Sequence, residues 1–413
     1  MAPKRRVVVT GMGIVSSIGN NCTEVVQSLR EGRSGITFSP EQAALGFRSQ
    51  VYGKPTLDWT QVGPRKPRRF LGMGSAWNFA AMEEAIQMAK LPPELVSNVR
   101  TGLIMGSGGP SVAAIVGAAD TVRRDKNPKK IGPFEVPKAM SSTASATLAV
   151  PFQIKGHNFS VSSACATSAH CIGLAAQQIC DGYQDVGFAG GSEELNEYLS
   201  AVFDAMPAMS AGFNDRPAVA SRAFDKRRDG FVIAGGAAVL VLEAYEFAYI
   251  RKAPILAELV GFGLSSDGHD MVQPSGEGAI RCMQMALKSL TTGERLHDRI
   301  GYINPHGTST PVGDVKEIEA IRAVFGENMP PISSTKSLTG HSLGAVGAQE
   351  AVYSIMALRE GFLPASAHIE ELDPVFDGVP ILREKVDATP EMVLSNSFGF
   401  GGTNASLVFK RFE

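Results

Sequence analysis

The feature that most constrains this fold is a set of short motifs that occur twice, in the same order. One set recurs at a constant offset of 250 (261 − 11): Gly11, Gly13 and Ser16 with Gly261, Gly263 and Ser266. A second recurs at an offset of 171 (334 − 163): Ser163, His170, Gly173 and Gln178 with Ser334, His341, Gly344 and Gln349. A third pairs Gly235-Gly236 with Gly401-Gly402 before apolar segments. Ordered repeats indicate duplication, so we predict two related halves, 1–253 and 254–413.

Segments typical of strands and helices alternate along the chain. We expect strands at 6–10, 101–105 and 158–161, and helices at 21–31 and 75–90. A glycine-rich turn should follow the first strand, and the basic stretch 123–133 should be irregular and lie on the surface. Alternation of this kind predicts an α/β fold in which helices cover sheets.

Cys165 lies at a turn from a strand into a helix. The strand 158–161 ends in small residues, and apolar residues then recur at helical spacing up to Ile179, before Asp181-Gly182. Free backbone amides and the helix dipole at such a position favour thiolate, the nucleophilic form of cysteine. We therefore predict a nucleophile. The alternative is a buried structural cysteine, which is the usual role of a lone cysteine.

Composition excludes several classes of function. The net charge of −2 does not favour wholesale nucleic-acid binding. Five cysteines without a CxxC pair indicate a reducing, cytoplasmic location and argue against disulfides or structural zinc. No apolar run approaches the roughly 18 residues of a membrane span. Charged residues are only 19% of the chain, which suggests burial in an oligomer interface.

Two histidines, His306 and His341, lie in loops rich in Gly, Ser and Thr. If the halves face each other, the second elbow would bring His341 and Lys336 towards Cys165. A cysteine with two imidazoles suits acyl transfer followed by carbon–carbon bond formation, because neutral imidazoles can hold a carbonyl oxygen as it gains negative charge. A cysteine protease would need one histidine and an orienting Asn or Asp. A metal site fits poorly, since the histidines are 35 residues apart (341 − 306) without nearby cysteines.

Four stretches, 161–173, 304–314, 336–344 and 395–404, closely resemble the β-ketoacyl-[acyl-carrier-protein] synthases of fatty acid synthesis. The resemblance extends from the opening VVTGMGIVS to the end of the chain. The sequence SSACATSAHCIG at 162–173 and SLREGRSGITFS at 28–39 resemble the synthase I branch of that family.

This resemblance implies a thiolase-type fold of five layers, α-β-α-β-α, in a homodimer. Cys165 would be the acylated nucleophile in a decarboxylative condensation that elongates fatty acids by two carbons and releases CO2. His306 and His341 would hold the malonyl carbonyl, and the backbone amides of Cys165 and Phe400 would form the oxyanion hole. No cofactor is implied, because phosphopantetheine arrives on the carrier protein.

The resemblance also implies roles for residues around these groups. Lys336 would give electrostatic support, paired with Glu317, while Thr308 and Thr310 would contact the pantetheine arm. Phe398 and Phe400 would gate the acyl pocket, with turn packing as the alternative for both. The expected carrier-binding residues, suited to steering an acidic partner, are Lys66, Arg69, Lys126 and Lys129.

The chain departs from the family pattern at Pro305, where Ser or Ala is common. Proline lacks a backbone N–H and fixes φ, so we expect a small displacement of His306 with activity retained.

Two competing functions remain open at this point. A non-catalytic chain-length factor would resemble these synthases but lack the cysteine. A thiolase-fold enzyme acting on coenzyme A thioesters would carry a Cys-His-Asn or Cys-His-Cys set, which His341 in Thr-Gly-His disfavours.

Overall fold

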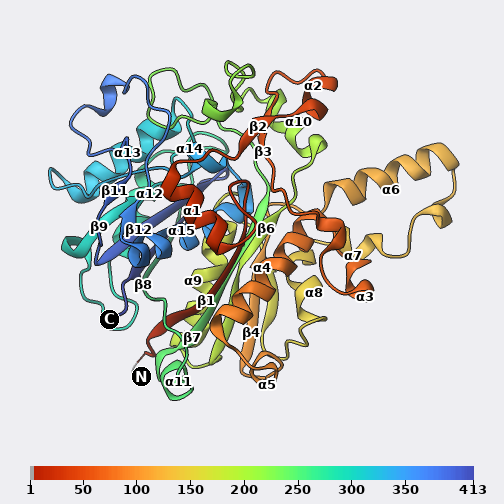
Figure 1. Cartoon of the computed structure of the whole chain (residues 1–413), viewed down its shortest axis with the longest axis horizontal. Coiled ribbons are helices and arrows are strands. Elements are labelled where there is room, and N and C mark those ends of the chain that lie inside the picture. Colours follow the sequence, from red (N-terminus) through yellow and green to blue (C-terminus); the bar gives the residue numbers. More distant parts are fainter. Residues whose placement is uncertain (1–3) are drawn as a thin grey trace.

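A computed structural model describes residues 4–413, in which nine strands form one continuous sheet (Figure 1). Its order is β5-β4-β6-β7-β1-β8-β13-β12-β9. The N-terminal half supplies β1 (Val7–Val15), β4 (Thr101–Gly106), β5 (Asn158–Val161), β6 (Val186–Glu193) and β7 (Gly236–Ala244). The C-terminal half supplies β8 (Ala257–Ser266), β9 (Ile300–Asn304), β12 (Met392–Gly399) and β13 (Thr403–Lys410).

The two halves have the same strand order and directions, counted outward from their junction. β1-β7-β6-β4 in one half corresponds to β8-β13-β12-β9 in the other, with antiparallel, antiparallel and parallel pairing in each. The place of β5 is taken in the second half by Ile332, which bridges to Ile303 in parallel. At the junction, β1 and β8 pair through only two residues each. The predicted duplication is therefore visible in the topology.

Three hydrophobic cores separate five layers. Helices α4 (Met73–Ala89) and α8 (Thr143–Ala149) cover the outer face of the first half-sheet. Helices α12 (Glu277–Ala286) and α13 (Gly313–Phe325) cover the outer face of the second. Between the half-sheets, α9 (Thr167–Cys180) and α15 (Val346–Glu360) share one core with both inner faces. The five-layered, thiolase-type arrangement expected from the resemblance is confirmed.

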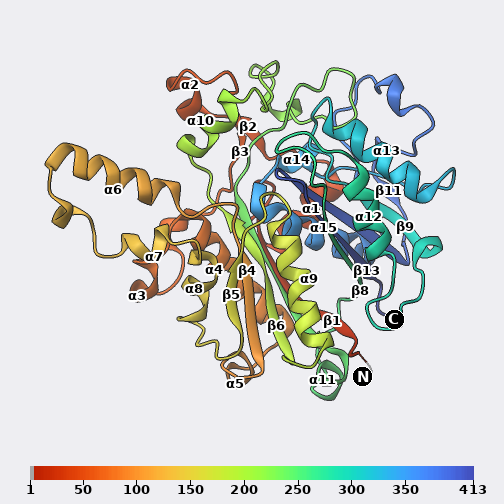
Figure 2. The same ribbon diagram turned by 180° about the vertical axis from the view of Figure 1, so that it is seen from behind.

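The remaining elements lie around these layers. The helices are α1 (Cys22–Glu31), α2 (Pro40–Ala44), α3 (Arg65–Arg68), α5 (Pro93–Val96), α6 (Val112–Asp125), α7 (Glu135–Ala139), α10 (Glu197–Ala205), α11 (Tyr245–Ile250) and α14 (Lys336–Thr339). Two small sheets pair β2 (Ile36–Phe38) with β3 (Val51–Gly53), and β10 (Phe362–Leu363) with β11 (Val386–Asp387). Figure 2 shows α6 extending away from the body of the molecule. The predicted boundary at 253/254 lies between α11 and β8.

The motif repeated at offset 250 has a structural cause. A Cβ at Gly11 or Gly13 would lie 2.2 or 1.9 Å from a carbonyl oxygen of α4, and one at Gly261 or Gly263 would lie 2.0 or 1.9 Å from one of α12. Only glycine lets these helices pack so closely on the strands. A glycine-rich turn was expected after residue 10. Because Gly11 and Gly13 instead allow close packing of α4, the strand β1 continues to Val15.

The motif repeated at offset 171 does not describe the structural equivalence. The equivalent helices α9 and α15 begin at Thr167 and Val346, an offset of 179 (346 − 167). The elbow residues with positive φ, Ala164 (49°) and Leu343 (47°), are also 179 apart. The second half inserts α14 before its elbow, which displaces the match seen in the sequence.

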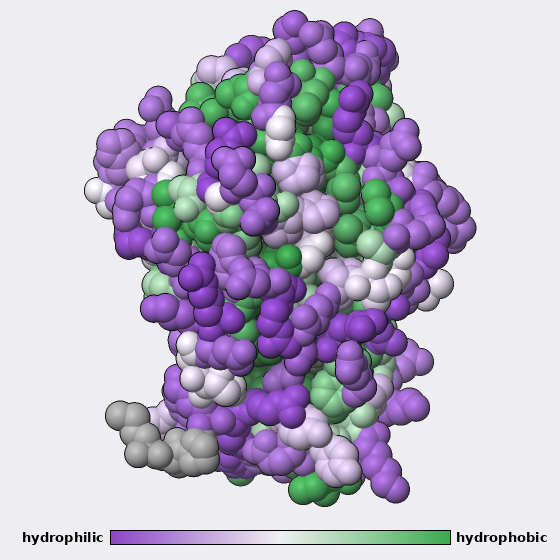
Figure 3. Space-filling view, turned by 90° about the vertical axis from the view of Figure 1, so that its left-hand side faces the viewer, coloured by the Kyte–Doolittle hydropathy of each residue, from purple (hydrophilic) through white to green (hydrophobic). Residues whose placement is uncertain are grey.

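Other predicted elements differ only locally. Helices 21–31 and 75–90 correspond to α1 and α4 within two residues, and strands 101–105 and 158–161 to β4 and β5. The stretch 123–133 was expected to be irregular, but α6 continues through Asp125 before the chain leaves the helix. No helix within residues 4–413 is both long and apolar enough to span a membrane. Figure 3 shows a largely hydrophilic face, with hydrophobic residues gathered mostly in its upper half.

We expect Gly13→Ala to lower the free energy of unfolding by about 1–3 kcal/mol, because the added methyl overlaps a backbone oxygen that cannot move without shifting α4. Chemical denaturation would measure this. Gly132→Ala is the matched control, because its Cβ would meet only a side chain at an ordinary 3.5 Å. Equal stability of the two variants would contradict the packing explanation.

Candidate active site

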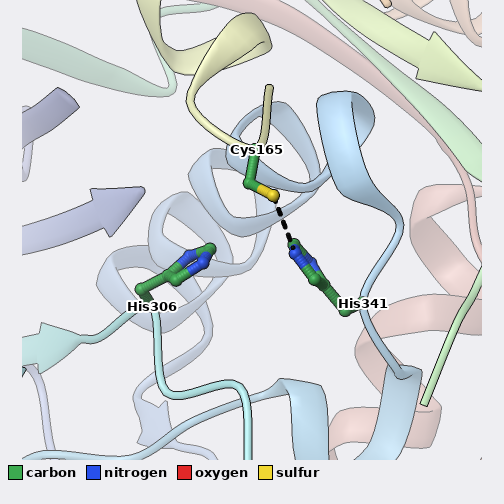
Figure 4. Close-up of side chains that lie close together, drawn as sticks. All are labelled: Cys165, His306 and His341. Carbon is green, nitrogen blue, oxygen red and sulfur yellow. Dashed lines mark hydrogen bonds between the residues drawn. The ribbon is translucent and has the colours of Figure 1, made fainter. Parts of the chain in front are cut away.

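Three reactive side chains from distant parts of the chain meet in one pocket (Figure 4). Cys165 precedes α9, His306 follows β9, and His341 lies between α14 and the elbow of the second half. The Nε2 atom of His341 lies 3.1 Å from the Sγ atom of Cys165. One nitrogen of each imidazole and the sulfur all lie within 4.8 Å of one another. The structure thus brings together the groups that the two-elbow arrangement required.

The Cys165 elbow is held by both halves of the chain. Ala164 takes a positive φ of 49°, and the amide of Ser163 donates to Oγ1 of Thr167 at 2.7 Å. From the second half, Thr403 Oγ1 donates to the Ser163 carbonyl at 2.9 Å. A Cβ at Gly399 would lie 3.0 Å from the Cys165 nitrogen, so the glycine permits this close approach. The sulfur therefore has a fixed direction.

The thiol of Cys165 is neutral at rest, which differs from the thiolate expected from the sequence. Burial raises its pKa to about 12, although the charge of Lys336 and a backbone hydrogen bond from Phe400 act to lower it. The helix begins at Thr167, two residues beyond the cysteine. The amides at the elbow do not outweigh the loss of solvation.

Both histidines are kept uncharged. Burial, and next the positive charge of Lys336, hold the pKa of His306 and of His341 well below 6.5. Their rings meet edge to face with centroids 5.2 Å apart, and Phe231 packs edge-on against His341 at 5.4 Å. The Nδ1 atom of each ring is buried without a hydrogen-bond partner within the described residues, 4–413. Neutral imidazoles can each donate one N–H to a substrate oxygen.

The main chain positions these rings. The amides of His306 and Gly307 donate to the Glu317 carboxylate at 2.8 and 2.7 Å. His341 is held in a strand-like bridge, where its amide donates to the Val232 carbonyl at 2.7 Å. Pro305 is buried in the His306 loop, whose hydrogen bonds to Glu317 use the two following amides and need no N–H at position 305.

The ion pair expected between Lys336 and Glu317 is wrong. The Nζ atom of Lys336, which is 1% exposed, pairs with Glu350 on α15, while Glu317 accepts the loop amides. Burial raises the pKa of each of the two carboxyls to about 7, and Lys336 acts to lower both. Sequence reasoning missed Glu350. Its signal was a carboxylate inside an otherwise apolar or small-residue helix, a position where a charge needs a partner.

The pocket is a cavity of about 330 Å³, and most of the other expected active-site residues line it. Thr308 and Thr310 lie on its wall with their hydroxyl oxygens 3.1 Å apart. The ring centroids of Phe398 and His306 lie 6.2 Å apart, and the Phe400 residue is 37% exposed. The apolar residues of this wall that were not predicted include Phe203, Met206 and Phe231.

The basic residues expected to bind a carrier lie outside the cavity. Lys66 is on α3, and Arg69 directly follows that helix. Lys126 caps the C-terminal end of α6, and Lys129 lies in the short turn after it. All four are exposed, and in residues 4–413 none of them is within 4 Å of a carboxylate. Figures 1 and 2 show α3 and α6 on the same side of the molecule. Arg69 stacks over the ring of Phe134, which links this cluster to the segment before α7.

Comparisons with known proteins agree along the whole chain. The family "Beta-ketoacyl synthase, N-terminal domain" matches residues 4–248, and "Beta-ketoacyl synthase, C-terminal domain" matches 256–370. The chain is 55% identical over 410 residues to 3-oxoacyl-[acyl-carrier-protein] synthase 1 of Escherichia coli K12, covering 99% of this chain and 100% of that protein.

Solved structures give the same answer. A β-ketoacyl synthase from Burkholderia phymatum superposes with a TM-score of 0.92 at 37% identity, over 99% of this chain and 100% of that one. A ketosynthase of a type II polyketide synthase, solved with its acyl-carrier protein, superposes with a TM-score of 0.89 at 28% identity and the same coverage. With the duplicated five-layer fold and the cysteine–histidine pocket, these matches show that the chain belongs to the β-ketoacyl synthase family.

Proposed function

We propose that this chain is a 3-oxoacyl-[acyl-carrier-protein] synthase that elongates fatty acids. It would condense an acyl group on Cys165 with malonyl-[acyl-carrier-protein] and release CO2, leaving a chain two carbons longer. The single observation that carries the proposal is the cluster of one sulfur and two imidazole nitrogens within 4.8 Å. The name of the 55% identical relative supports the same reaction.

In the first half-reaction the acyl group moves from the carrier to Cys165. The Nε2–H group of His341, 3.1 Å from the sulfur, donates to it and stabilises the negative charge that develops as the sulfur attacks the thioester carbon. The amides of Cys165 and Phe400 stabilise the tetrahedral oxyanion, and the backbone hydrogen bond from Phe400 towards the sulfur supports this assignment. The thiol proton passes to the carrier sulfur as the bond between that sulfur and the acyl carbon breaks, so the carrier leaves as a thiol and His341 keeps its Nε2 hydrogen.

In the second half-reaction malonyl-[acyl-carrier-protein] loses CO2. His306 and His341, in the tautomers with hydrogen on Nε2, donate to the thioester carbonyl oxygen as electrons from the breaking C–C bond reach it. The resulting carbanion attacks the acyl carbon on Cys165, and the cysteine leaves as thiolate. Burial keeps both rings neutral, and Lys336 supports this because its positive charge also lowers their pKa values.

Other surroundings of the site have supporting roles. Thr308 and Thr310 would contact the pantetheine arm, and Phe398 and Phe400 would gate the acyl pocket that they line. The enzyme would need no cofactor of its own, since phosphopantetheine arrives on the carrier. Lys66, Arg69, Lys126 and Lys129 would dock the carrier, and the related polyketide ketosynthase solved in complex with its acyl-carrier protein supports such a partner.

We also propose a cytoplasmic homodimer. Strand β5 is the outer edge of the sheet, with Phe159 41% exposed. An exposed edge strand can pair with the same strand of a second copy around a twofold axis, which continues the sheet and covers the edge.

The alternatives from the sequence are less well supported. A chain-length factor would lack the nucleophile, whereas Cys165 lies in hydrogen-bonding reach of His341. A metal site is disfavoured because the 3.1 Å contact is shorter than the roughly 3.5 Å between sulfur and nitrogen ligands around a tetrahedral zinc ion.

Cys165→Ala should abolish condensation, while malonyl decarboxylation persists because both imidazoles remain. Product analysis with carrier-linked substrates would measure both steps. Cys180→Ala is the control, because that thiol is buried outside the cavity. Condensation by the Cys165→Ala variant would exclude the cysteine as nucleophile.

His306→Ala or His341→Ala should slow decarboxylation by about 10²–10³, the usual loss for one oxyanion donor. Because the pKa of each ring lies well below 6.5, the neutral form persists as the pH falls through that value. In the Cys165→Ala background, the decarboxylation rate should therefore not drop between about pH 8 and about pH 6. A titration with its midpoint near 6.5 would show that the rings are exposed to solvent and charged.

The double variant Lys66→Glu/Arg69→Glu should raise KM for a carrier-linked substrate by about tenfold with kcat unchanged, because surface charges act mainly on encounter. Steady-state kinetics at low and high salt would measure this, with the difference shrinking at high salt. Lys252→Glu, an exposed basic residue at the end of α11, is the control. An equal effect of the control would mean that α3 has no special role in docking.

A further inference from the structure

Glu193 is a buried carboxylate with no part in the reaction described above. It is the last residue of β6 and is 1% exposed. It lies where the elbows of the two halves approach each other. A charged group in such a position is costly unless it makes hydrogen bonds that the fold needs.

The carboxylate of Glu193 joins the two halves directly. Its Oε2 atom accepts from the amide of Gly108 at 2.7 Å and from the amide of Gly344 at 2.9 Å. Its Oε1 atom accepts from the Ser107 hydroxyl at 3.0 Å. One oxygen therefore connects the loop after β4 with the elbow of the second half.

Both connected segments lead to reacting groups. Gly344 follows Leu343, the elbow residue with φ of 47°, which lines the active-site cavity two residues after His341. On the other side, the Ser162 hydroxyl donates to the Gly108 carbonyl at 3.4 Å, three residues before Cys165. The packing is tight, because a Cβ at Gly344 would lie 2.3 Å from the Gly108 nitrogen.

The charge of Glu193 also reaches the nucleophile. His306 and His341 each have a ring nitrogen within 4.8 Å of the Cys165 sulfur. Burial raises the thiol pKa most; among charged groups, Lys336 acts to lower it and Glu193 acts to raise it. The protonation state of Glu193 itself depends on its surroundings. Burial raises its pKa to about 7, the amides of Gly108 and Gly344 lower it, and neighbouring Glu194 raises it.

We propose that Glu193 is a positioning residue that ties the Cys165 elbow to the elbow following His341, and that its negative charge opposes formation of the thiolate on Cys165. The effect on catalysis rests on the proposed condensation. The effect on the thiol does not, since alkylation of Cys165 needs no substrate.

The test compares Glu193→Gln with the wild-type protein. The glutamine oxygen can accept from both amides in place of Oε2, while its NH2 group faces the Ser107 hydroxyl, so the shape is kept and the charge is removed. Iodoacetamide alkylation of Cys165, followed by mass spectrometry across pH, is the readout. We expect the rate profile to move to lower pH, with a rate near neutrality about threefold to tenfold above wild type.

Glu194→Gln is the matched control. This adjacent buried carboxylate accepts from Ser111 and from the amide of Ala113 at the start of α6, away from the elbows. Its alkylation profile should not move to lower pH, because losing the Glu194 charge favours the charged form of Glu193. An unchanged profile in Glu193→Gln, a shift to higher pH, or an equal shift in the control would overturn the proposal.

Glu193→Ala tests the connection between the elbows. It should lower kcat for condensation by more than about tenfold with KM for the carrier substrate little changed, because misaligned reacting groups slow chemistry rather than docking. A wild-type kcat would overturn the positioning role.

If neither Glu193 variant folds, Ser107→Ala removes one donor to the carboxylate and should raise the alkylation rate near neutrality; an unchanged rate would overturn the charge effect. Loss of condensation in the wild-type protein itself would instead refute the proposed function.

Discussion

The site depends on the close contact between the central helices α9 and α15. A Cβ at Gly347 would lie 2.8 Å from the Ala169 nitrogen, and the amide of Ala348 donates to the Ser168 hydroxyl at 2.8 Å. These contacts involve the first residues of each helix, directly after the two elbows. The sulfur and the His341 imidazole meet because no larger side chain separates the helices at this point.

The second requirement is that charge stays inside the protein. Lys336 and Glu350 form an ion pair within the central layer, and burial raises the pKa values of Glu350 and Glu317 to about 7. Burial, and next the positive charge of Lys336, keep both imidazoles neutral, as hydrogen-bond donation to a developing oxyanion requires. A buried ion pair of this kind adds little to the free energy of unfolding, so we attribute its presence to its electrostatic effect on the imidazoles.

Much of this arrangement follows from local sequence. Glycine pairs at offset 250 predicted the duplicated halves because each glycine is needed for the same helix contact. The chemistry of Cys165, His306 and His341 was evident from residue type and loop composition. The partner of Lys336, the thiol form of Cys165 and the 179-residue offset of the elbows were not, because they depend on which groups the tertiary structure buries together. The spacing of motifs in a sequence does not show which side chains will be shielded from water.

The second elbow also explains why a duplicated chain carries one nucleophile. Its position equivalent to Cys165 is Gly344, 179 residues later (344 − 165), where any side chain would collide with the Gly108 nitrogen. Packing has thereby made the two copies complementary: one elbow presents a reactive atom, and the other gives up its side chain so that the backbones can interlock. Neither half could be replaced by a second copy of the other without losing either the sulfur or the fit.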